Sequence, residues 1–401
     1  MQIILFENDR VNALYPITLT RPGFDILCGG TTLFDLVKLE FPKANITWLV
    51  RDYLAKVIQQ KHGRSVIKAD KKVLFLDASL APSAAEARAL EARIKSGKNF
   101  ILNNKGRLAA VFIDYQNEIK KLKQADVERW LSKQKVKNLA ARWPRFEHLW
   151  EIITLNNQLL RSNLELLYKP GVSKGRDASL AKHVLFDASA GPIVIGDNVE
   201  IAPFVNLAGP LYIGHNCKIR EFSVIKAACL GPFCKVGGEV EGSIIQGYSN
   251  KQHYGVLAHS YVGDWVNLGG GTTVSDLKNT YGHVKMAGQD SGELFLGSVI
   301  GDYSKTAINT AIFTGKIIGV NSALFGFVTR DAPSFTNYLG QLGENVEFSL
   351  DQAIKVQKIV LARRNLKQTG ADVELLKNVF KMTQMERNKA GVKKGKLTFN
   401  K

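Results

Sequence analysis

One histidine in this sequence stands in a context that favours proton transfer. His253 lies in the loop 247–255, where a six-residue repeat of aliphatic side chains is interrupted. Histidine is the side chain whose ordinary pKa suits the removal of a proton near neutral pH, as is needed when an amine attacks an acyl group. A loop histidine taken alone is more often a solvated surface residue, so the prediction of a general base depends on the elements around it.

The repeat that must position His253 runs through most of the C-terminal half. Branched aliphatic residues recur every six positions at Ile195, Ile201, Leu207, Ile213, Ile219 and Ile225. Phase shifts separate further blocks, namely Leu230 and Val236; Val256, Val262, Leu268 and Val274; and Leu294, Ile300, Ile312, Ile318 and Leu324. In the last block the polar Thr306 occupies the repeat position between Ile300 and Ile312. This period predicts a parallel β-helix of triangular section, with the aliphatic side chains on its axis and Gly or Asn at corners that need positive φ.

The N-terminal part has a different pattern. Strand-like runs at 3–6, 46–50, 73–76 and 100–102 alternate with helical spacing over 32–40, 53–62 and 83–96, which is typical of an α/β domain with a mostly parallel sheet. A helical stretch over 143–168 ends at Pro170-Gly171, and an amphipathic helix begins near 351. We therefore expect an α/β domain over 1–142, a linker helix over 143–171, the β-helix over 172–340, and a C-terminal helix with a basic tail over 341–401.

The net charge of +18 has two interpretations. A basic surface attracts the phosphates of nucleotides, coenzyme A or nucleic acid. Many of the lysines, however, fall in the stretch 120–137, which we expect to be helical, and in the tail 389–401. Such runs are usually solvated faces, so nucleic acid is not expected as a partner.

Composition excludes several classes of protein. With 45% hydrophobic and 22% charged residues, the chain can bury a core, and neither disorder nor a membrane span is expected as its main organisation. The first apolar run is interrupted at Glu7 and lacks the features of a signal peptide, which predicts a cytoplasmic location. The cysteines at 28, 217, 229 and 234 form no C-x-x-C pair, so packed, reduced thiols are favoured over a zinc site.

Several segments of the repeat region carry a family resemblance. The segments VGDWVNLGGGTT, DLKNTYGHVK and IGDYSKTAINTAIFTGKIIGVNS resemble the bifunctional bacterial enzyme of UDP-N-acetylglucosamine synthesis, GlmU, and more closely a divergent branch of that family. His253 matches the family's catalytic histidine, fourteen residues before the Asn of V-N-[IL]-G, here Asn267. The resemblance implies a left-handed β-helix, a homotrimer, and catalytic roles for both residues.

The same resemblance implies residues that bind the sugar phosphate. Asp276 and Lys285, in and after DLKNTYGHVK, are expected to complete the site. The family's usual Asn is replaced by Asp276, and its usual phosphate-binding Lys by Glu241, so Lys251 is the nearest cation that could bind the phosphate instead. The alternative for each of these residues is a corner or surface role in the β-helix.

The N-terminal half resembles the nucleotidyltransferase domain of the same family in outline. Such domains cradle a triphosphate with a G-x-G-T-R-x-x-P loop and hold Mg²⁺ with oxygen ligands. Here ENDRVNALYPITLTRPGFDIL lacks those glycines and Gly23 replaces the usual lysine, so Arg21 is the expected phosphate-binding catalytic cation, with Arg10 a weaker candidate. Asp77 and Asn156 match the family's Mg²⁺ ligands, although Asp77 could instead belong to the N-cap region of a helix.

The resemblance implies a bifunctional enzyme. The β-helix would transfer an acetyl group from acetyl-CoA to glucosamine-1-phosphate, and the α/β domain would transfer uridylyl from UTP with Mg²⁺, giving UDP-N-acetylglucosamine. Two alternatives stay open because the glycine loop is absent. One is a monofunctional acetyltransferase whose N-terminal domain only binds or docks, and the other is a regulatory or scaffold subunit without activity.

Overall fold

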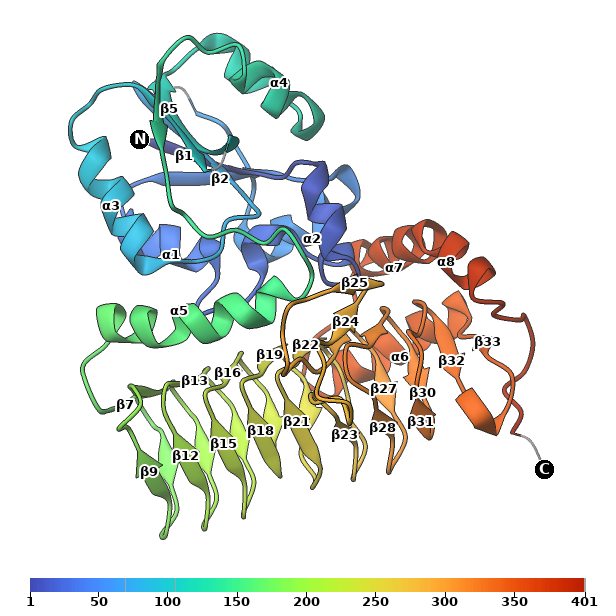
Figure 1. The fold of residues 1–401 in the computed structure, drawn as a ribbon. Helices are drawn as coiled ribbons and strands as arrows, with labels where there is room; N and C mark the ends of the chain where they lie inside the picture. The colour runs from blue at the N-terminus through green and yellow to red at the C-terminus, as the bar shows by residue number, and fades with distance from the viewer. Residues whose placement is uncertain (69, 105, 400–401) are drawn as a thin grey trace.

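The computed structural model describes residues 1–68, 70–104 and 106–399 (Figure 1). Lys401, part of the expected basic tail, lies outside the described residues. An N-terminal α/β domain sits along one side of a long β-helix, and helices near the C-terminus return to the N-terminal domain. No helix in the described ranges is both long and apolar enough to span a bilayer.

A six-stranded mixed sheet with the order β2-β1-β3-β5-β4-β6 forms the centre of the N-terminal domain. Its strands are β1 (Gln2–Phe6), β2 (Asn45–Leu49), β3 (Lys72–Asp77), β4 (Phe100–Asn104), β5 (Arg107–Asp114) and β6 (Lys137–Ala140). The four predicted strands are present, and β5 and β6 were not predicted. Only β5 opposes the other five strands, because it pairs antiparallel with both β3 and β4, so the sheet is mixed but mostly parallel, as predicted.

Helices α1 (Leu33–Glu40), α2 (Asp52–His62) and α3 (Ala84–Ile94) match the predicted helical spacing. The hydroxyls of Thr32 and Ser83 cap α1 and α3 by accepting backbone N–H groups, as N-cap residues do. The stretch 120–137 is not one helix: it contains the end of a 3₁₀ turn, the short helix α4 (Val127–Leu131) and the start of β6. Packing of Val127 and Leu131 on the sheet, rather than helical period, decides the conformation there.

The long helix α5 (Glu151–Leu167) begins later than the predicted 143, because the chain around Arg145 instead pairs with Leu80 as an isolated bridge. In Figure 1, α5 lies across the first coils of the β-helix. Its buried residues include Leu160 and Leu164, which pack against Val194 of the β-helix. The helix therefore joins the two domains through side-chain packing as well as through the chain.

The C-terminal half is a left-handed parallel β-helix with three faces. The first face contains β7 (Val172–Lys174), β10 (Ile193–Ile195), β13 (Leu211–Ile213), β16 (Cys229–Leu230), β19 (Ile244–Gly247), β22 (Tyr261–Asp264), β26 (Val299–Ile300) and β29 (Ile317–Ile318). The second face contains β8 (Ser179–Leu180), β11 (Glu200–Ile201), β14 (Lys218–Ile219), β17 (Lys235–Val236), β20 (Asn250–Lys251), β27 (Lys305–Thr306), β30 (Ala323–Leu324), β32 (Thr336–Tyr338) and β33 (Val346–Glu347). The third face contains β9 (Leu185–Asp187), β12 (Asn206–Ala208), β15 (Val224–Lys226), β18 (Glu239–Glu241), β21 (Val256–Ala258), β23 (Thr273–Val274), β28 (Ala311–Ile312) and β31 (Phe327–Val328).

The six-residue repeat does fill the axis, with two exceptions. Val256 is only half-buried, and the adjacent Leu257 occupies the axis instead. Leu294 is exposed because it lies in an insertion that carries the hairpin β24 (Lys285–Met286) and β25 (Gln289–Asp290). Both errors follow loops that add residues to a coil, since an inserted residue shifts every later side chain to a new direction.

The corners differ from the prediction in residue type. Asn198, Asn216 and Asn321 do adopt positive φ, as expected. Aromatic residues also adopt positive φ at the corner between the first and second faces, at Phe233, Tyr248, Trp265 and Tyr303, and these rings stack from coil to coil. Stacking of large rings offsets the cost of a conformation that L-residues usually avoid.

Other parts of the chain cover most of the first face and the C-terminal part of the second face, whereas Glu200 and Lys218 on the first coils of the second face are exposed. Side chains of the first face, such as Tyr261 and Ile244, share a buried cluster with Leu27 of the N-terminal domain and Ile152 of α5. Near the second face lies α6 (Leu350–Ala362), followed by α7 (Gly370–Met382) and α8 (Gln384–Lys389), and Figure 1 places α7 close to α2. The four cysteines are free and buried, as predicted.

Candidate functional site

His253 lies at the corner between the second and third faces, in the loop that joins β20 to β21. Its side chain is exposed, forms no hydrogen bond with any described residue, and lies beside Gly270 of the next coil. An imidazole with both nitrogens uncommitted at an accessible corner can accept a proton from a bound substrate.

Lys251 holds this loop from inside the β-helix. Its buried amine donates to the carbonyl oxygens of Gly237 at 2.7 Å, His253 at 3.1 Å and Gly255 at 2.7 Å. Burial lowers the pKa of Lys251 to about 8. The structure does not support the prediction that Lys251 binds a sugar phosphate, because three backbone carbonyls already accept from the amine, away from solvent.

Asn267 lies on the outer side of the second face, between Asn250 and Lys305. Its side-chain oxygen accepts a hydrogen bond from Asn250 at 3.3 Å, and the residue is exposed. Asn267 is thus close in the fold to the loop that contains His253, and its role there stays a prediction.

Asp276 and Lys285 lie elsewhere in the same chain. Asp276 follows β23, at the corner between the third and first faces, and Lys285 is exposed on the hairpin of the insertion. The structure of one chain does not bring either residue to His253, because the whole width of the third face separates the two corners. A single copy therefore does not assemble the expected site.

Sequence reasoning missed a second histidine at the corner of Asp276. Nδ1 of His259 lies 2.7 Å from Oδ2 of Asp276, and the imidazole ring rests on Gly242, where a Cβ would come within 2.7 Å of it. A carboxylate at Nδ1 fixes the tautomer and leaves Nε2 as the proton acceptor. The short spacing from His253 to His259 in the sequence was the only available signal.

The N-terminal domain has its own candidate site where the strand order reverses. The chain passes from β1 to β2 on one side and returns to β3 on the other, so the loops after β1 and β3 flank a switch point. Ligands of open α/β sheets bind outside the carboxyl ends of strands at such points. Asn8 and Asp77 lie there, joined by a 2.9 Å hydrogen bond from the Asn8 amide.

The expected Mg²⁺ ligands do not fit a shared metal ion. Asp77 is fully buried, and its oxygens already accept from the amide of Asn8 and from the backbone and hydroxyl of Ser79. Asn156 lies within α5, where its oxygen accepts the Gly29 N–H at 2.8 Å. The two residues have no hydrogen-bond partner in common, and the described ranges contain no cluster of three or more His, Cys, Asp or Glu suited to a metal.

Arg21 does not lie at the switch point. Its guanidinium is buried between the domains, where it pairs with Asp302 and, at 3.0 Å, with Asp264, and it donates to the Tyr261 hydroxyl. Burial favours the neutral form, but the two carboxylates outweigh it and hold the pKa of Arg21 above its ordinary value. These ion pairs do not support the expectation of a phosphate-binding Arg21, whereas the weaker candidate Arg10 does lie near the switch point and pairs with Glu128 at 3.3 Å.

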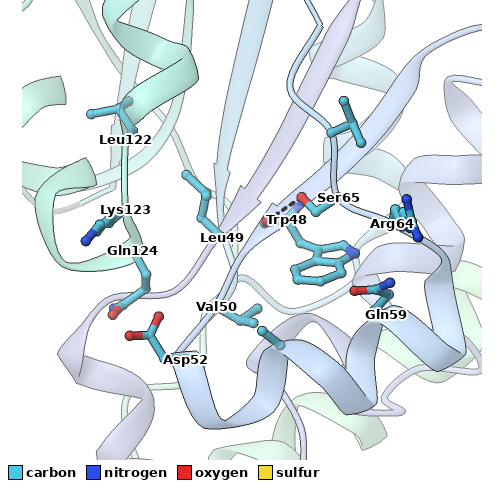
Figure 2. A pocket seen from close by; sticks show the side chains of 12 residues that line it. Trp48, Leu49, Val50, Asp52, Gln59, Arg64, Ser65, Leu122, Lys123 and Gln124 are labelled. Atoms are coloured by element: carbon cyan, nitrogen blue, oxygen red, sulfur yellow. Dashed lines mark hydrogen bonds between the residues drawn. The ribbon is translucent and has the colours of Figure 1, made fainter.

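A cavity of about 680 Å³ opens at the carboxyl end of β2. Figure 2 shows Trp48, Ser65 and Arg64 on one side of it and Lys123 and Gln124 on the other. The Gln124 amide donates to the carbonyl of Glu7 at 3.0 Å, so the cavity borders the switch point. Trp48 is largely buried in the core, so the charged side chains that line the cavity are Arg64, Lys123 and Asp52. The two cations can attract a phosphate group, and none of these residues was predicted as a site residue.

Two parts of the chain match models of transferase families, which supports a sugar acyl or nucleotidyl transferase. Residues 3–170 match the model of the sugar nucleotidyl transferase family, and residues 192–227 match the bacterial transferase hexapeptide model of six repeats. No curated protein matches the chain.

Solved structures with likeness to the chain include three acyltransferases. UDP-N-acetylglucosamine acyltransferase of Francisella novicida is 16% identical, with a TM-score of 0.25, over 54% of this chain and 68% of that chain. The acetyltransferase domain of PglB from Neisseria gonorrhoeae is 11% identical, with a TM-score of 0.17, over 44% and 60%. A variant of GDP-perosamine N-acetyl transferase from Caulobacter crescentus is 9% identical, with a TM-score of 0.14, over 83% and 90%.

Proposed function

We propose that the β-helix transfers an acetyl group from acetyl-CoA to the amine of an amino-sugar phosphate, with glucosamine-1-phosphate as the first substrate to test. The observation that carries this proposal is His253, an uncommitted imidazole on a corner of a hexapeptide-repeat β-helix, in a loop that the buried Lys251 holds in place. His253 would take the amine proton as the N–C bond forms. As the C–S bond of the thioester breaks, the imidazolium would return that proton to the leaving sulfur.

The third face supports a trimer. Its side chains Leu185, Val224, Phe313 and Phe327 are large, apolar and exposed, while the chain itself covers most of the first face and the C-terminal part of the second. Three copies with their third faces toward a common axis would place the His253 corner of one copy beside the Asp276 corner of the next. In this arrangement two copies would complete the site that one copy leaves divided.

The homotrimer can be tested by light scattering on the purified protein. We expect a mass of three times 44.3 kDa, and Phe313→Lys should shift it toward the monomer because it puts a charge among the exposed apolar side chains of the third face. Leu39→Lys is the matched control, since Leu39 is also a large exposed apolar residue but lies on α1 of the N-terminal domain. A stable monomer of the unmodified protein under active conditions would contradict the proposal.

For the N-terminal domain we propose nucleotide binding in the cavity beside Trp48 without uridylyl transfer. Arg21 and Asn156 are committed to structural contacts and Asp77 is enclosed, so the monofunctional alternative is favoured. The second candidate is the bifunctional enzyme that makes UDP-N-acetylglucosamine from UTP, which the match over residues 3–170 favours.

One assay separates these functions. The protein is mixed with glucosamine-1-phosphate, acetyl-CoA, UTP and Mg²⁺, and free thiol and pyrophosphate are followed separately. We expect thiol release without pyrophosphate. Release of both would establish the bifunctional enzyme, and release of neither would leave the regulatory or scaffold subunit.

A further inference from the structure

The second face carries a cavity of about 250 Å³ whose wall is unusually basic. Lys235 and Lys305 project outward from β17 and β27, and Arg363 and Arg364 approach from the end of α6. No Asp or Glu lines the cavity, and none of the four cations forms an ion pair with a carboxylate in the described part of the chain. Four like charges around one small cavity repel one another unless an anion joins them.

The polar contacts within the cavity leave donors available. The Lys305 amine donates to the carbonyl of Tyr303 at 2.8 Å, and Arg364 donates to the side-chain oxygen of Asn250 at 2.9 Å. The side chains of Lys235 and Arg363 have no hydrogen-bond partner among the described residues. Each of these four groups can therefore donate at least one more hydrogen bond to an anion, because an ammonium has three donors and a guanidinium five.

The pKa values of both lysines lie below their ordinary range, and the neighbouring charges contribute to the shift of Lys235. Burial lowers the pKa of Lys305 to about 8. The pKa of Lys235 is also lowered, by burial and by the nearby charges of Arg364, Lys218 and Arg363. A bound anion would favour the charged form of both amines.

We propose that this cavity, formed by Lys235, Lys305, Arg363 and Arg364, binds a phosphate or diphosphate group of a ligand. Asn267 lines the same cavity, and so does Gln252, the residue before His253. The cavity thus adjoins the loop of the candidate base. That the group belongs to a substrate of acetyl transfer, either the sugar phosphate or the nucleotide end of acetyl-CoA, rests on the proposed function, whereas anion binding itself does not.

The test measures binding of inorganic pyrophosphate to the full chain by calorimetry, at constant ionic strength set with chloride. A charge-assisted hydrogen bond is typically worth about 1.5–3 kcal/mol, so Lys305→Met and Lys235→Met should each weaken binding by about tenfold or more. Lys182→Met is the matched control: Lys182 is an exposed lysine that follows β8, on the same face of the β-helix but several coils away from the cavity. This control variant should bind pyrophosphate as tightly as the unmodified protein does.

Thermal unfolding separates binding from a structural role. Without pyrophosphate, Lys235→Met should unfold at the same or a higher temperature than the unmodified protein, because it removes repulsion and breaks no hydrogen bond. With pyrophosphate, the unmodified protein should gain stability and the variant should not. The proposal is overturned if pyrophosphate does not bind the unmodified protein, or if both lysine variants bind it as the unmodified protein does.

Two further arms identify the source of the phosphate group. If the phosphate group belongs to acetyl-CoA, Lys235→Met should raise KM for acetyl-CoA and leave KM for the amino-sugar phosphate unchanged. If it belongs to the amino-sugar phosphate, the same variant should raise KM for that substrate and leave KM for acetyl-CoA unchanged. If the protein shows no acetyl transfer but binds pyrophosphate as described, the proposed function fails and the anion site stands.

Discussion

Replacing His253 with alanine is expected to lower kcat for acetyl transfer by about a hundred- to ten-thousand-fold, the usual contribution of a general base. KM should change little, because the imidazole acts on the proton of the attacking amine rather than on the rest of the substrate. The measurement is the rate of thiol release from acetyl-CoA with glucosamine-1-phosphate. Nucleotide binding should be unaffected, since the cavity beside Trp48 lies in the other domain.

His183→Ala is the matched control for this experiment. His183 is an exposed histidine at the same corner of the β-helix, several coils away from His253. Its ring stacks on Phe204. Its removal should leave kcat unchanged. Full activity of His253→Ala would contradict the assignment, and a loss of activity in His259→Asn alone would move the base to the pair of His259 and Asp276.

Replacing Arg21 with alanine is expected to destabilise the folded protein by about 3–5 kcal/mol, the usual cost of breaking a buried ion pair by removing one partner. Asp302 is buried and would lose the cation that it shares with Asp264. The pKa of Asp264 is already raised to about 6, by burial and by the charge of Asp302 against the opposing effect of Arg21. Chemical denaturation followed by tryptophan fluorescence measures the change.

Lys56→Ala is the control for Arg21→Ala. Lys56 on α2 pairs with Glu374 on α7 at 2.7 Å, but both side chains are exposed, so their pairing is worth at most about 1 kcal/mol. If Arg21→Ala unfolds as the unmodified protein does and instead loses nucleotide binding, the guanidinium is a phosphate ligand after all, and its burial between the domains has no role in stability.

Much of the fold could be predicted from periodicity. A period of six in branched aliphatic residues fixes which side chain of each strand points to the axis, and residues such as Ile213, Ile219 and Ile225 are buried as predicted. The prediction failed at Val256 and Leu294, each next to an inserted loop. Strand β5 escaped prediction because antiparallel pairing to β3 depends on contacts far along the chain.

The candidate site, like the fold, could be predicted from the sequence only in part. The sequence by itself determined that His253 stands in a loop that breaks the repeat, because both the repeat and its interruption are local. Residue type and position did not reveal the partners of charged groups. Arg21 is paired with Asp302, 281 residues away, and Lys251 points inward onto backbone carbonyls.

Only the tertiary structure decided which charges are neutralised and which remain free. The packing of the first face against the N-terminal domain encloses Arg21 with two carboxylates, because a buried charge is stable only when it is paired. The return of the C-terminal helices brings Arg363 and Arg364 to Lys235 and Lys305 with no carboxylate among them. A sequence records how many charges a chain carries, but the meeting of distant surfaces determines whether each one holds the fold together or is left to bind a ligand.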